Sequence, residues 1–220
     1  EDPGQAVLGA EFICWLHREF YSHLPEEERF TTSEDGTRHP LQPGELRDCN
    51  VGVGRHIPPD HPALPRFLER FERFYSDRGI LATDRLLAAA AAHHRLAWIH
   101  PFVDGNGRVA RLHSQAALIS AGLSSHGLWT LSRGLARARP KYYRLLQGAD
   151  QRRFHDFDGR GNLSDRALGD FCGFFLARVL DQIEFMVGLI SPFSLQDRVE
   201  SYFRFKRVDL APKFREGFSR

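Results

Sequence analysis

Pro101 constrains the fold of this chain more than any other residue, because it must end the clearest helix in the sequence. Residues 83–99 repeat apolar side chains at helical spacing around a run of alanines, and Thr83 stands where an N-cap is expected. A residue before proline is disfavoured in the α-helical region, so this helix should end near His100. We therefore expect a strong helix with a histidine at its exit.

A second helix is predicted directly after a turn rich in glycine. It begins within Gly105-Asn106-Gly107 and runs to Gly122, a residue that suits the left-handed conformation often found after a helix. The loop between the two helices is six residues long. The sequence thus predicts a helix, a short loop and a second helix in succession.

Most of the remaining chain also shows helical periodicity. Between residues 41 and 59, however, proline and glycine are frequent, and Val51 and Val53 alternate with glycine as in a short extended segment. We expect a small β-hairpin there, in a domain that is otherwise all-α. The other predicted helices cover residues 7–24, 63–75, 140–149, 164–188 and 192–205, with Ser164 and Ser191 as N-caps of the last two.

The composition is that of a folded globular domain. Of 220 residues, 42% are hydrophobic and 26% are charged, which argues against disorder. The net charge of +2 is too small to favour nucleic acid or a membrane surface as a partner, and no apolar run is long enough to span a bilayer. Three cysteines without zinc-type spacing fit a reducing compartment, so a cytoplasmic location is expected.

Residues 100–111 hold an unusual density of polar and reactive groups. Gly105 and Gly107 flank Asn106, so backbone N–H groups can approach a ligand closely there. The helix that starts in this turn directs its unpaired N–H groups and its positive dipole end to the same point. The arrangement predicts an anion-binding turn.

The charged side chains around this turn indicate which anion it binds. Arg108 and Arg111 are three residues apart, hence neighbours on one helical face, where their guanidinium groups can grip phosphate oxygens. Asp104 offers a hard oxygen ligand for Mg2+, which commonly binds one or two carboxylates together with substrate phosphates. His100 is a base suited to removing a proton from an attacking hydroxyl near neutral pH.

Each of these residues also has a plain structural explanation. Asp-Gly-Asn-Gly is a common turn composition, and His100 could cap the preceding helix. A metal hydrolase built on His93, His100 and Asp104 is a further alternative, although helices supply metal ligands more often at a spacing of three or four. Residues 156–162 echo the glycine turn but lack its histidine and second arginine, so we interpret them as a loop.

Residues 100–111 match every fixed position of the pattern His-x-Phe-x-Asp/Glu-Gly-Asn-Gly-Arg-x-x-Arg, and the chain therefore resembles the Fic domain family (filamentation induced by cAMP). The likeness extends from about residue 10 to about residue 190, and the segment 44–59 resembles the family's flap. It implies an all-α, Fic-type helical domain with a small β-hairpin flap over residues 1–190. Residues 191–220 would begin a C-terminal helical appendage.

The resemblance implies transfer of AMP from ATP to a Ser, Thr or Tyr hydroxyl of a target protein. In that assignment His100 is the general base, Asp104 holds Mg2+, and a buried Phe102 anchors the loop. The flap residues Val51, Gly52 and Val53 would position a target segment by main-chain pairing. The residues expected to bind the nucleotide are Gly105, Asn106, Gly107, Arg108, Arg111 and Tyr143.

Two features depart from the family pattern. Asp150 stands where the family has an asparagine that contacts the base, and a carboxylate can only accept hydrogen bonds. Many members are also restrained by a helix bearing Ser/Thr-x-x-x-Glu-Gly/Asn, but here Glu216-Gly217 has Pro212 at the hydroxyl position. Either the protein is unrestrained, or the inhibitory glutamate lies before Glu1 or on another chain.

Several functions remain open from the sequence alone. Fic-type proteins also transfer other phosphate-containing groups or remove AMP, and a non-catalytic nucleotide-sensing module is an alternative of another class. The expected partners are a nucleotide and a protein with a hydroxyl side chain. A homo-oligomer is compatible with the sequence, which does not identify the target.

Overall fold

The computed structural model describes residues 7, 9–32, 38–54, 56–75, 81–124, 126–191 and 197–204. This part of the chain is mainly helical, as predicted, with one small antiparallel hairpin. In chain order the elements are α2 (Ala10–Ser22), η1 (Glu26–Glu28), β1 (Phe30–Thr32), β2 (Arg38–Pro40), η2 (His61–Ala63), α3 (Leu64–Tyr75), α4 (Ala82–Ile99), α5 (Asn106–Ser120), α6 (Leu131–Arg137), α7 (Arg139–Gly148) and α8 (Asp165–Ile190).

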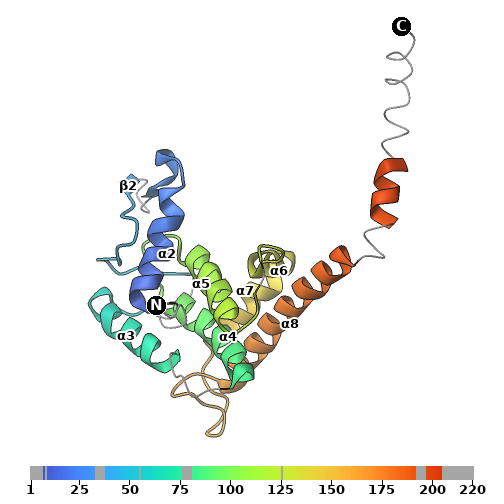
Figure 1. The fold of residues 1–220 in the computed structure, drawn as a ribbon. Coiled ribbons are helices and arrows are strands. Elements are labelled where there is room, and N and C mark those ends of the chain that lie inside the picture. The colour runs from blue at the N-terminus through green and yellow to red at the C-terminus, as the bar shows by residue number, and fades with distance from the viewer. Residues whose placement is uncertain are drawn as a thin grey trace.

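Helices α4 and α5 form the centre of the fold, with α2 and α3 on one side and α6, α7 and α8 on the other (Figure 1). A hydrophobic cluster lies on each side of this central pair. The first comprises Ile13, Leu16, Leu64, Leu68, Phe71, Ala92, Leu96, Ile99, Phe102, Val109 and Ala110. The second is built around Ala90, Leu118, Leu131, Leu135, Tyr142, Phe171, Phe175 and Val179. Because both helices are packed on both sides, the loop that joins them is held at each end.

The ends of the central helices agree with the sequence signals except at one position. Helix α4 ends at Ile99, before Pro101, as expected. After α5, Gly122 takes a φ of +99°, and Leu123 N donates to Leu118 O at 2.9 Å, which is the Schellman arrangement. The prediction of Thr83 as an N-cap is wrong, because α4 already begins at Ala82 and has no side-chain cap.

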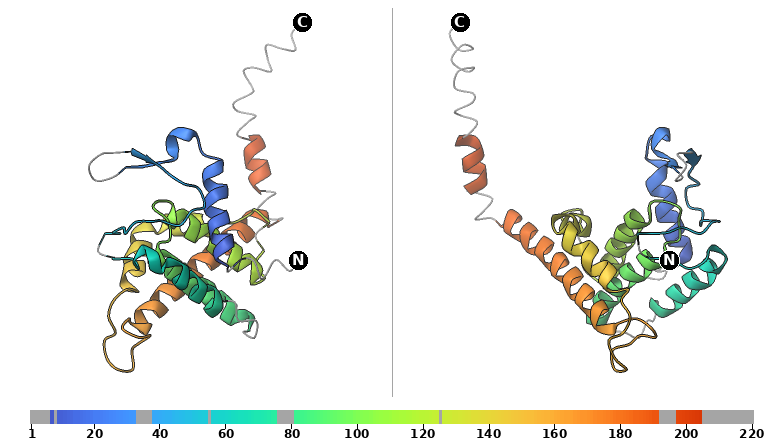
Figure 2. Two further views of the ribbon diagram at one scale, coloured as in Figure 1. Left: turned by 90° about the vertical axis from the view of Figure 1, so that its left-hand side faces the viewer. Right: turned by 180° about the vertical axis from the view of Figure 1, so that it is seen from behind.

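Helix α8 runs as one long helix beside α6 and α7 (Figure 2). Ser164 caps it as predicted, since its hydroxyl oxygen accepts from Ala167 N at 3.0 Å. Residues 197–204 are helical within the predicted 192–205, whose start at residues 192–196 lies outside the described residues. Among the described residues, no helix is long and apolar enough to cross a membrane.

The paired strands lie upstream of the expected hairpin. The ladder joins β1 to β2, with Thr31 opposite His39. Among the described residues of 41–59, the strand pairing consists of a single bridge between Val53 and His56, whose N–H and C=O groups exchange two hydrogen bonds of 3.0 Å. Prolines donate no backbone hydrogen bond and glycines add no cross-strand contact, so this stretch cannot extend the ladder.

Candidate active site

The loop between α4 and α5 carries a histidine in an uncommon backbone conformation. His100 has φ 52° and ψ 61°, and His126 is the other non-glycine residue with positive φ in the described part of the chain. The left-handed region costs an L-residue about 1–2 kcal/mol. Pro101 excludes the helical alternative, so the backbone turns at His100 and takes its imidazole out of the helix.

The hydrogen bond of the His100 ring fixes its tautomer. Nδ1 lies 3.3 Å from the carbonyl oxygen of Ala97, and a carbonyl only accepts, so Nδ1 carries the proton. Nε2 is then the unprotonated nitrogen. Burial, with smaller contributions from the nearby His56 and Arg47, lowers the pKa of His100 to about 4. The ring is therefore neutral at physiological pH, with Nε2 as a base.

Arg47 holds the backbone at His100 from the flap. Its Nε donates to His100 O at 2.8 Å, and its backbone N–H donates to Pro101 O at 2.9 Å. The same buried guanidinium donates to Cys49 O and Pro59 O, at the two sides of the flap. One side chain thus closes the base of the flap and ties it to the loop.

Asn106 stabilises the loop through its side chain. Its Oδ1 accepts from Phe102 N at 2.9 Å, and its Nδ2 donates to Phe102 O at 2.7 Å. Asn106 is buried, and Phe102 is fully buried, as predicted. The side-chain amide of Asn106 therefore bonds the backbone of the loop. Its backbone N–H belongs to the first turn of α5, where N–H groups have no acceptor within the helix.

Gly105 is required by both conformation and space. It is the N-cap of α5 with φ 81°, and a Cβ there would lie 2.7 Å from a ring carbon of Tyr21 and 2.8 Å from its hydroxyl oxygen. With no side chain at the N-cap, no capping oxygen competes for the first N–H groups of α5. This helix end is open to an anionic ligand.

Tyr21, on α2, bridges two of the predicted site residues. Its hydroxyl donates to Asp104 Oδ2 at 2.8 Å and accepts from Arg108 Nη1 at 2.7 Å. Arg108 Nη1 also lies 3.6 Å from Asp104 Oδ2. Burial raises the pKa of Tyr21, so the bridging hydroxyl keeps its proton. The structure thus brings Asp104 and Arg108 together at the start of α5.

His17, one helical turn before Tyr21, supports the same loop. Its Nδ1 accepts from Gly44 N at 2.8 Å, so the proton is on Nε2, which donates to Asp104 O at 3.2 Å. The imidazole also stacks on Phe102, with ring centroids 4.0 Å apart. Sequence analysis assigned no role to His17 or Tyr21. The feature of the sequence that could have pointed to them is their spacing of four residues, which puts both rings on one face of α2.

Arg111 lies on α5, where its guanidinium reaches back toward Gly107. A Cβ on Gly107 would come within 3.3 Å of Arg111 Nη1, so the guanidinium covers the first turn of α5. Burial raises the pKa of nearby Tyr142 to about 12, against the opposing positive charge of Arg111. Neighbouring Tyr143 exposes 44% of its surface, and its ring centroid is 5.1 Å from that of Tyr142. The ring of Tyr143 is accessible to a ligand, as its predicted role requires.

Asp150 binds a histidine of the core. Its Oδ1 accepts from Nε2 of buried His94 at 2.9 Å, and its Oδ2 lies 4.0 Å from Nδ1 of His56. Burial lowers the pKa of His94, so this pair joins a neutral ring to a carboxylate. His56 also donates from Nε2 to Trp98 O at 2.7 Å, which holds the flap turn against α4.

The metal hydrolase that the sequence left open as an alternative is not supported. His93 is fully buried and both of its ring nitrogens are hydrogen-bonded to Ser114 and Tyr142, so it offers nothing to a metal. In the described ranges, no group of three or more His, Cys, Asp or Glu side chains is placed to hold a metal ion.

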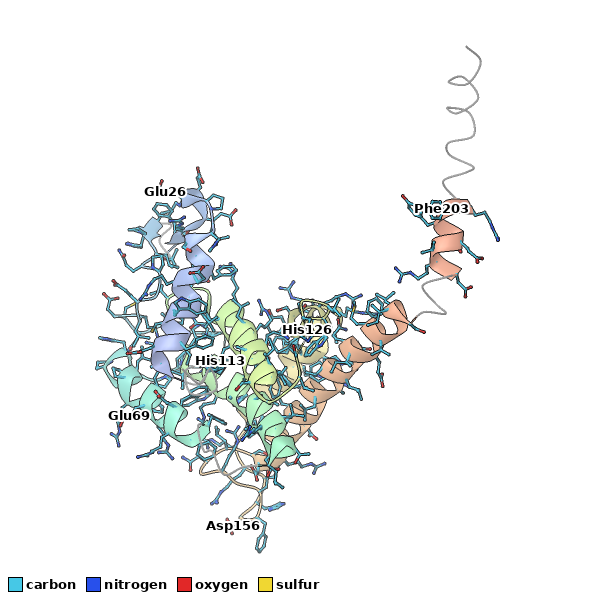
Figure 3. The ribbon with its side chains drawn as sticks, viewed as in Figure 1. Glu26, Glu69, His113, His126, Asp156 and Phe203 are labelled. Atoms are coloured by element: carbon cyan, nitrogen blue, oxygen red, sulfur yellow. The ribbon has the colours of Figure 1, made fainter. Side chains whose placement is uncertain are left out.

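Residues 156–162 form a loop, as interpreted, and Asp156 lies at its outer end (Figure 3). The candidate inhibitory residue Glu216 lies outside the described residues.

Comparison with curated proteins identifies several adenylyltransferases as relatives. The protein adenylyltransferase Fic of Drosophila erecta is 36% identical to this chain over 139 residues, which is 63% of the chain and 24% of that protein. The enzyme of the same name from Drosophila melanogaster gives the same identity and coverage. The chain thus spans about a quarter of the length of these relatives.

Solved structures share the fold. A Fic family protein from Desulfovibrio desulfuricans G20 superposes with a TM-score of 0.59 at 20% identity, over 83% of this chain and 48% of that one. Fic-1 of C. elegans gives a TM-score of 0.56 at 20% identity, over 83% and 44%. A family model described as the Fic/DOC family matches residues 7–118, which contain the flap, the loop and both arginines. The chain is therefore a member of the Fic/DOC family.

Proposed function

We propose that this chain transfers AMP from ATP to a hydroxyl side chain of a target protein, with residues 1–190 as the catalytic unit. The observation that supports this most strongly is the neutral imidazole of His100, with Nδ1 bonded to Ala97 O and Nε2 left as a base. A base beside an open helix N-terminus suits the attack of a hydroxyl on a phosphate. The related proteins named protein adenylyltransferase support the same activity.

The start of α5 binds the phosphates of ATP in this proposal. The N–H groups of Arg108 and Val109 both donate to Gly105 O, so those of Asn106 and Gly107 remain for the ligand. Arg108 and Arg111, which are neighbours on one face of α5, bind the outer phosphates. The exposed ring of Tyr143 lies against the nucleoside.

Mg2+ fits this site through Asp104. The hydrogen bond from Tyr21 and the ion pair with Arg108 both involve Oδ2, so Oδ1 is available to a metal ion. A single carboxylate next to phosphates is a common magnesium site, because the phosphates complete the ligand set. Bound there, Mg2+ neutralises phosphate charge and orients the leaving group. We assign Asp104 as the protein ligand.

The transfer step itself uses the His100 base. The target hydroxyl oxygen forms a bond to the α-phosphorus while the bond from that phosphorus to the bridging α–β oxygen breaks, and pyrophosphate leaves. The proton of the hydroxyl passes to Nε2 of His100, which releases it afterwards to solvent. The flap residues Val51, Gly52 and Val53 position the target segment; the N–H and C=O of Val53 are already bonded to His56, so main-chain pairing with the target falls to half-buried Val51 and exposed Gly52.

Labelling with ATP radioactive at the α-phosphate tests this function. The purified chain, incubated with Mg2+ and a cell lysate, should transfer label to protein, and a mass increase of one AMP should appear on modified peptides. His100→Ala should remove most of the labelling, since general-base catalysis contributes roughly 10²–10⁴-fold. The exposed His39 on β2 provides a matched control, because His39→Ala should label normally.

The same assay separates the alternatives. Preferential labelling from UTP or CTP would assign a different nucleotide, and loss of label from pre-modified protein would indicate AMP removal. Tight ATP binding without transfer to any protein would support a nucleotide-sensing module instead. Equal labelling by the His100→Ala variant would contradict the role of His100.

A further inference from the structure

The flap contributes a hydrogen bond to the C-terminal end of α4. A helix leaves its last carbonyl groups without partners of its own, and Trp98 O would bond the N–H of Phe102 only if α4 continued past Pro101. The N–H of Phe102 donates to Asn106 Oδ1 at 2.9 Å instead. Trp98 O accepts from Nε2 of His56 at 2.7 Å. A flap side chain thus completes the end of the helix that leads to the proposed base.

The His56 ring is a donor toward α4 in either of its charge states. A carbonyl oxygen accepts but does not donate, so Nε2 of His56 carries a proton whether the ring is neutral or charged. Nδ1 lies 4.0 Å from Oδ2 of Asp150, which is too long for a hydrogen bond. Asp150 is itself bonded by Nε2 of buried His94 at 2.9 Å. The Nε2 proton of His56 therefore stays with the carbonyl of α4.

Packing holds the His56 ring in the same place. Its side chain is only 17% exposed, and its ring centroid lies 5.6 Å from that of Trp98, the residue whose carbonyl it bonds. The Trp98 ring lies 5.7 Å from the ring of Phe67 on α3, and the guanidinium of Arg95 lies over it, 5.2 Å from the centroid. His56 therefore rests on a tryptophan that has neighbours on α3 and on α4.

The backbone of His56 connects this attachment to the rest of the flap. His56 N donates to Val53 O, and Val53 N donates to His56 O, both at 3.0 Å. Val51 and Gly52, the residues left for main-chain pairing with a target in the proposed function, directly precede Val53 in the chain. Hydrogen bonds from Val53 to His56 and from His56 to Trp98 thus join the target-binding segment to the last turn of α4.

We propose that His56 is a positioning residue, which fixes the place of the flap segment 51–52 relative to the imidazole of His100. This inference rests on the proposed function, because it assumes that the flap holds the target and that His100 takes the proton of its hydroxyl. A reacting hydroxyl and its base must be closely aligned, and misplacement by about 1 Å can cost on the order of 10²-fold in rate. His56 should therefore affect transfer to protein and leave nucleotide binding at the start of α5 unchanged.

Two substitutions of His56 separate the hydrogen bond from the bulk of the ring. His56→Phe keeps an aromatic ring against Trp98 but loses the donor, so the rate of protein labelling from ATP should fall by roughly three- to tenfold, the effect of one hydrogen bond. His56→Gln supplies an amide N–H on a side chain of similar reach and should retain most of the labelling. His39→Phe makes the same exchange at an exposed position on β2 and should label normally.

Calorimetric titration of ATP into the same variants distinguishes positioning from general damage to the fold. In His56→Phe, the Kd and KM for ATP should be unchanged while kcat falls. Normal labelling by His56→Phe, an equal loss in His56→Gln, or a rise in the Kd for ATP that accounts for the lost labelling would overturn the inference. If the unsubstituted protein transfers no label, or His100→Ala labels equally well, the proposed function fails instead.

Amide hydrogen exchange tests the structural link without any transfer. The N–H groups of Val53 and His56 should exchange with solvent faster in His56→Phe than in His56→Gln, because the flap bridge then loses its attachment to α4. Equal exchange in the two variants would contradict that link.

Discussion

Tyr21 donates its hydroxyl hydrogen to Oδ2 of Asp104 across 2.8 Å, although the two residues are 83 positions apart in the chain. The Tyr21 hydroxyl oxygen in turn accepts from Arg108 Nη1, so one buried ring sets the distance between a carboxylate and a guanidinium. In the proposed function these two groups serve Mg2+ and phosphate. The Tyr21 hydroxyl therefore couples the proposed Mg2+ ligand, Asp104, to the proposed phosphate ligand, Arg108.

Removing this hydroxyl should weaken the use of magnesium more than it weakens the fold. In Tyr21→Phe, Asp104 and Arg108 lose their common partner but remain partly exposed to water, so stability should fall by only about 1 kcal/mol. The concentration of Mg2+ that gives half-maximal labelling should rise several-fold. A magnesium titration of the labelling reaction measures this, and unchanged magnesium dependence would show that the bridge does not position Asp104.

The glycine at the N-cap of α5 should tolerate no side chain. Gly105→Ala meets both a φ of +81° and the Tyr21 ring at 2.7 Å, whereas Gly161→Ala meets a φ of +74° with nothing within 4 Å. The control should lose only the backbone term, about 1–2 kcal/mol. Gly105→Ala should lose more stability in thermal unfolding and should also lose ATP binding. Equal shifts in Tm for the two variants would refute the steric contribution.

Buried histidines should make the protein sensitive to mild acid. Burial lowers the pKa of His93 to about 3 and those of His100 and His113 to about 4, below the ordinary value of 6.5. The unfolded chain therefore binds these protons first, so stability is complete above about pH 6.5 and declines as pH falls toward 4. Tm measured between pH 7.5 and 4.5 should fall steadily.

His113 offers a way to check this cause. It lies on α5 and is buried against α2 and α3 (Figure 3), with its ring 6.5 Å from that of Phe12 and 5.5 Å from that of Phe71. His113→Gln removes one titrating group, so the decline of Tm with acid should become shallower even if the variant is less stable at pH 7.5. An unchanged slope would contradict a contribution from His113.

In the pH profile of the transfer rate, the fall on the acidic side should lie well below pH 6. The low pKa of His100, about 4, means that the free protein holds the base form throughout the physiological range. The pH dependence of kcat/KM reports the pKa values of groups in the free enzyme. Titration of His100 should therefore leave kcat/KM constant from pH 6 to 8. A limb centred near pH 6.5 would show that His100 is more exposed to water in solution than in this structure.

The sequence predicted the loop well because its residues are neighbours in the chain. Pro101 fixed the end of α4, and the glycine turn fixed the start of α5. His17 and Tyr21 could not be predicted in the same way, since their roles depend on how α2 packs against a loop more than 80 residues away. Helical periodicity shows that the two rings share a face, but not which surface that face meets.

Weak local sequence signals account for the other differences between the predicted and the observed secondary structure. Helix α6 (Leu131–Arg137) was not predicted, because seven residues are too few to show a clear period, although Thr130 caps it by accepting from Arg133 N at 3.3 Å. In the flap, alternation of Val51 and Val53 suggested strand pairing, but among its described residues the bridge from Val53 to His56 is the pairing that forms. Contacts of single side chains, above all Arg47, shape that segment instead.

Arg47 connects the flap to the backbone at His100. Its guanidinium reaches Cys49 O and Pro59 O in the flap and also His100 O, the carbonyl of the residue that carries the proposed base. One guanidinium thus ties both ends of the flap to the backbone that carries the imidazole, so in the proposed function a shift of the flap and a shift of the base are mechanically linked through a single side chain.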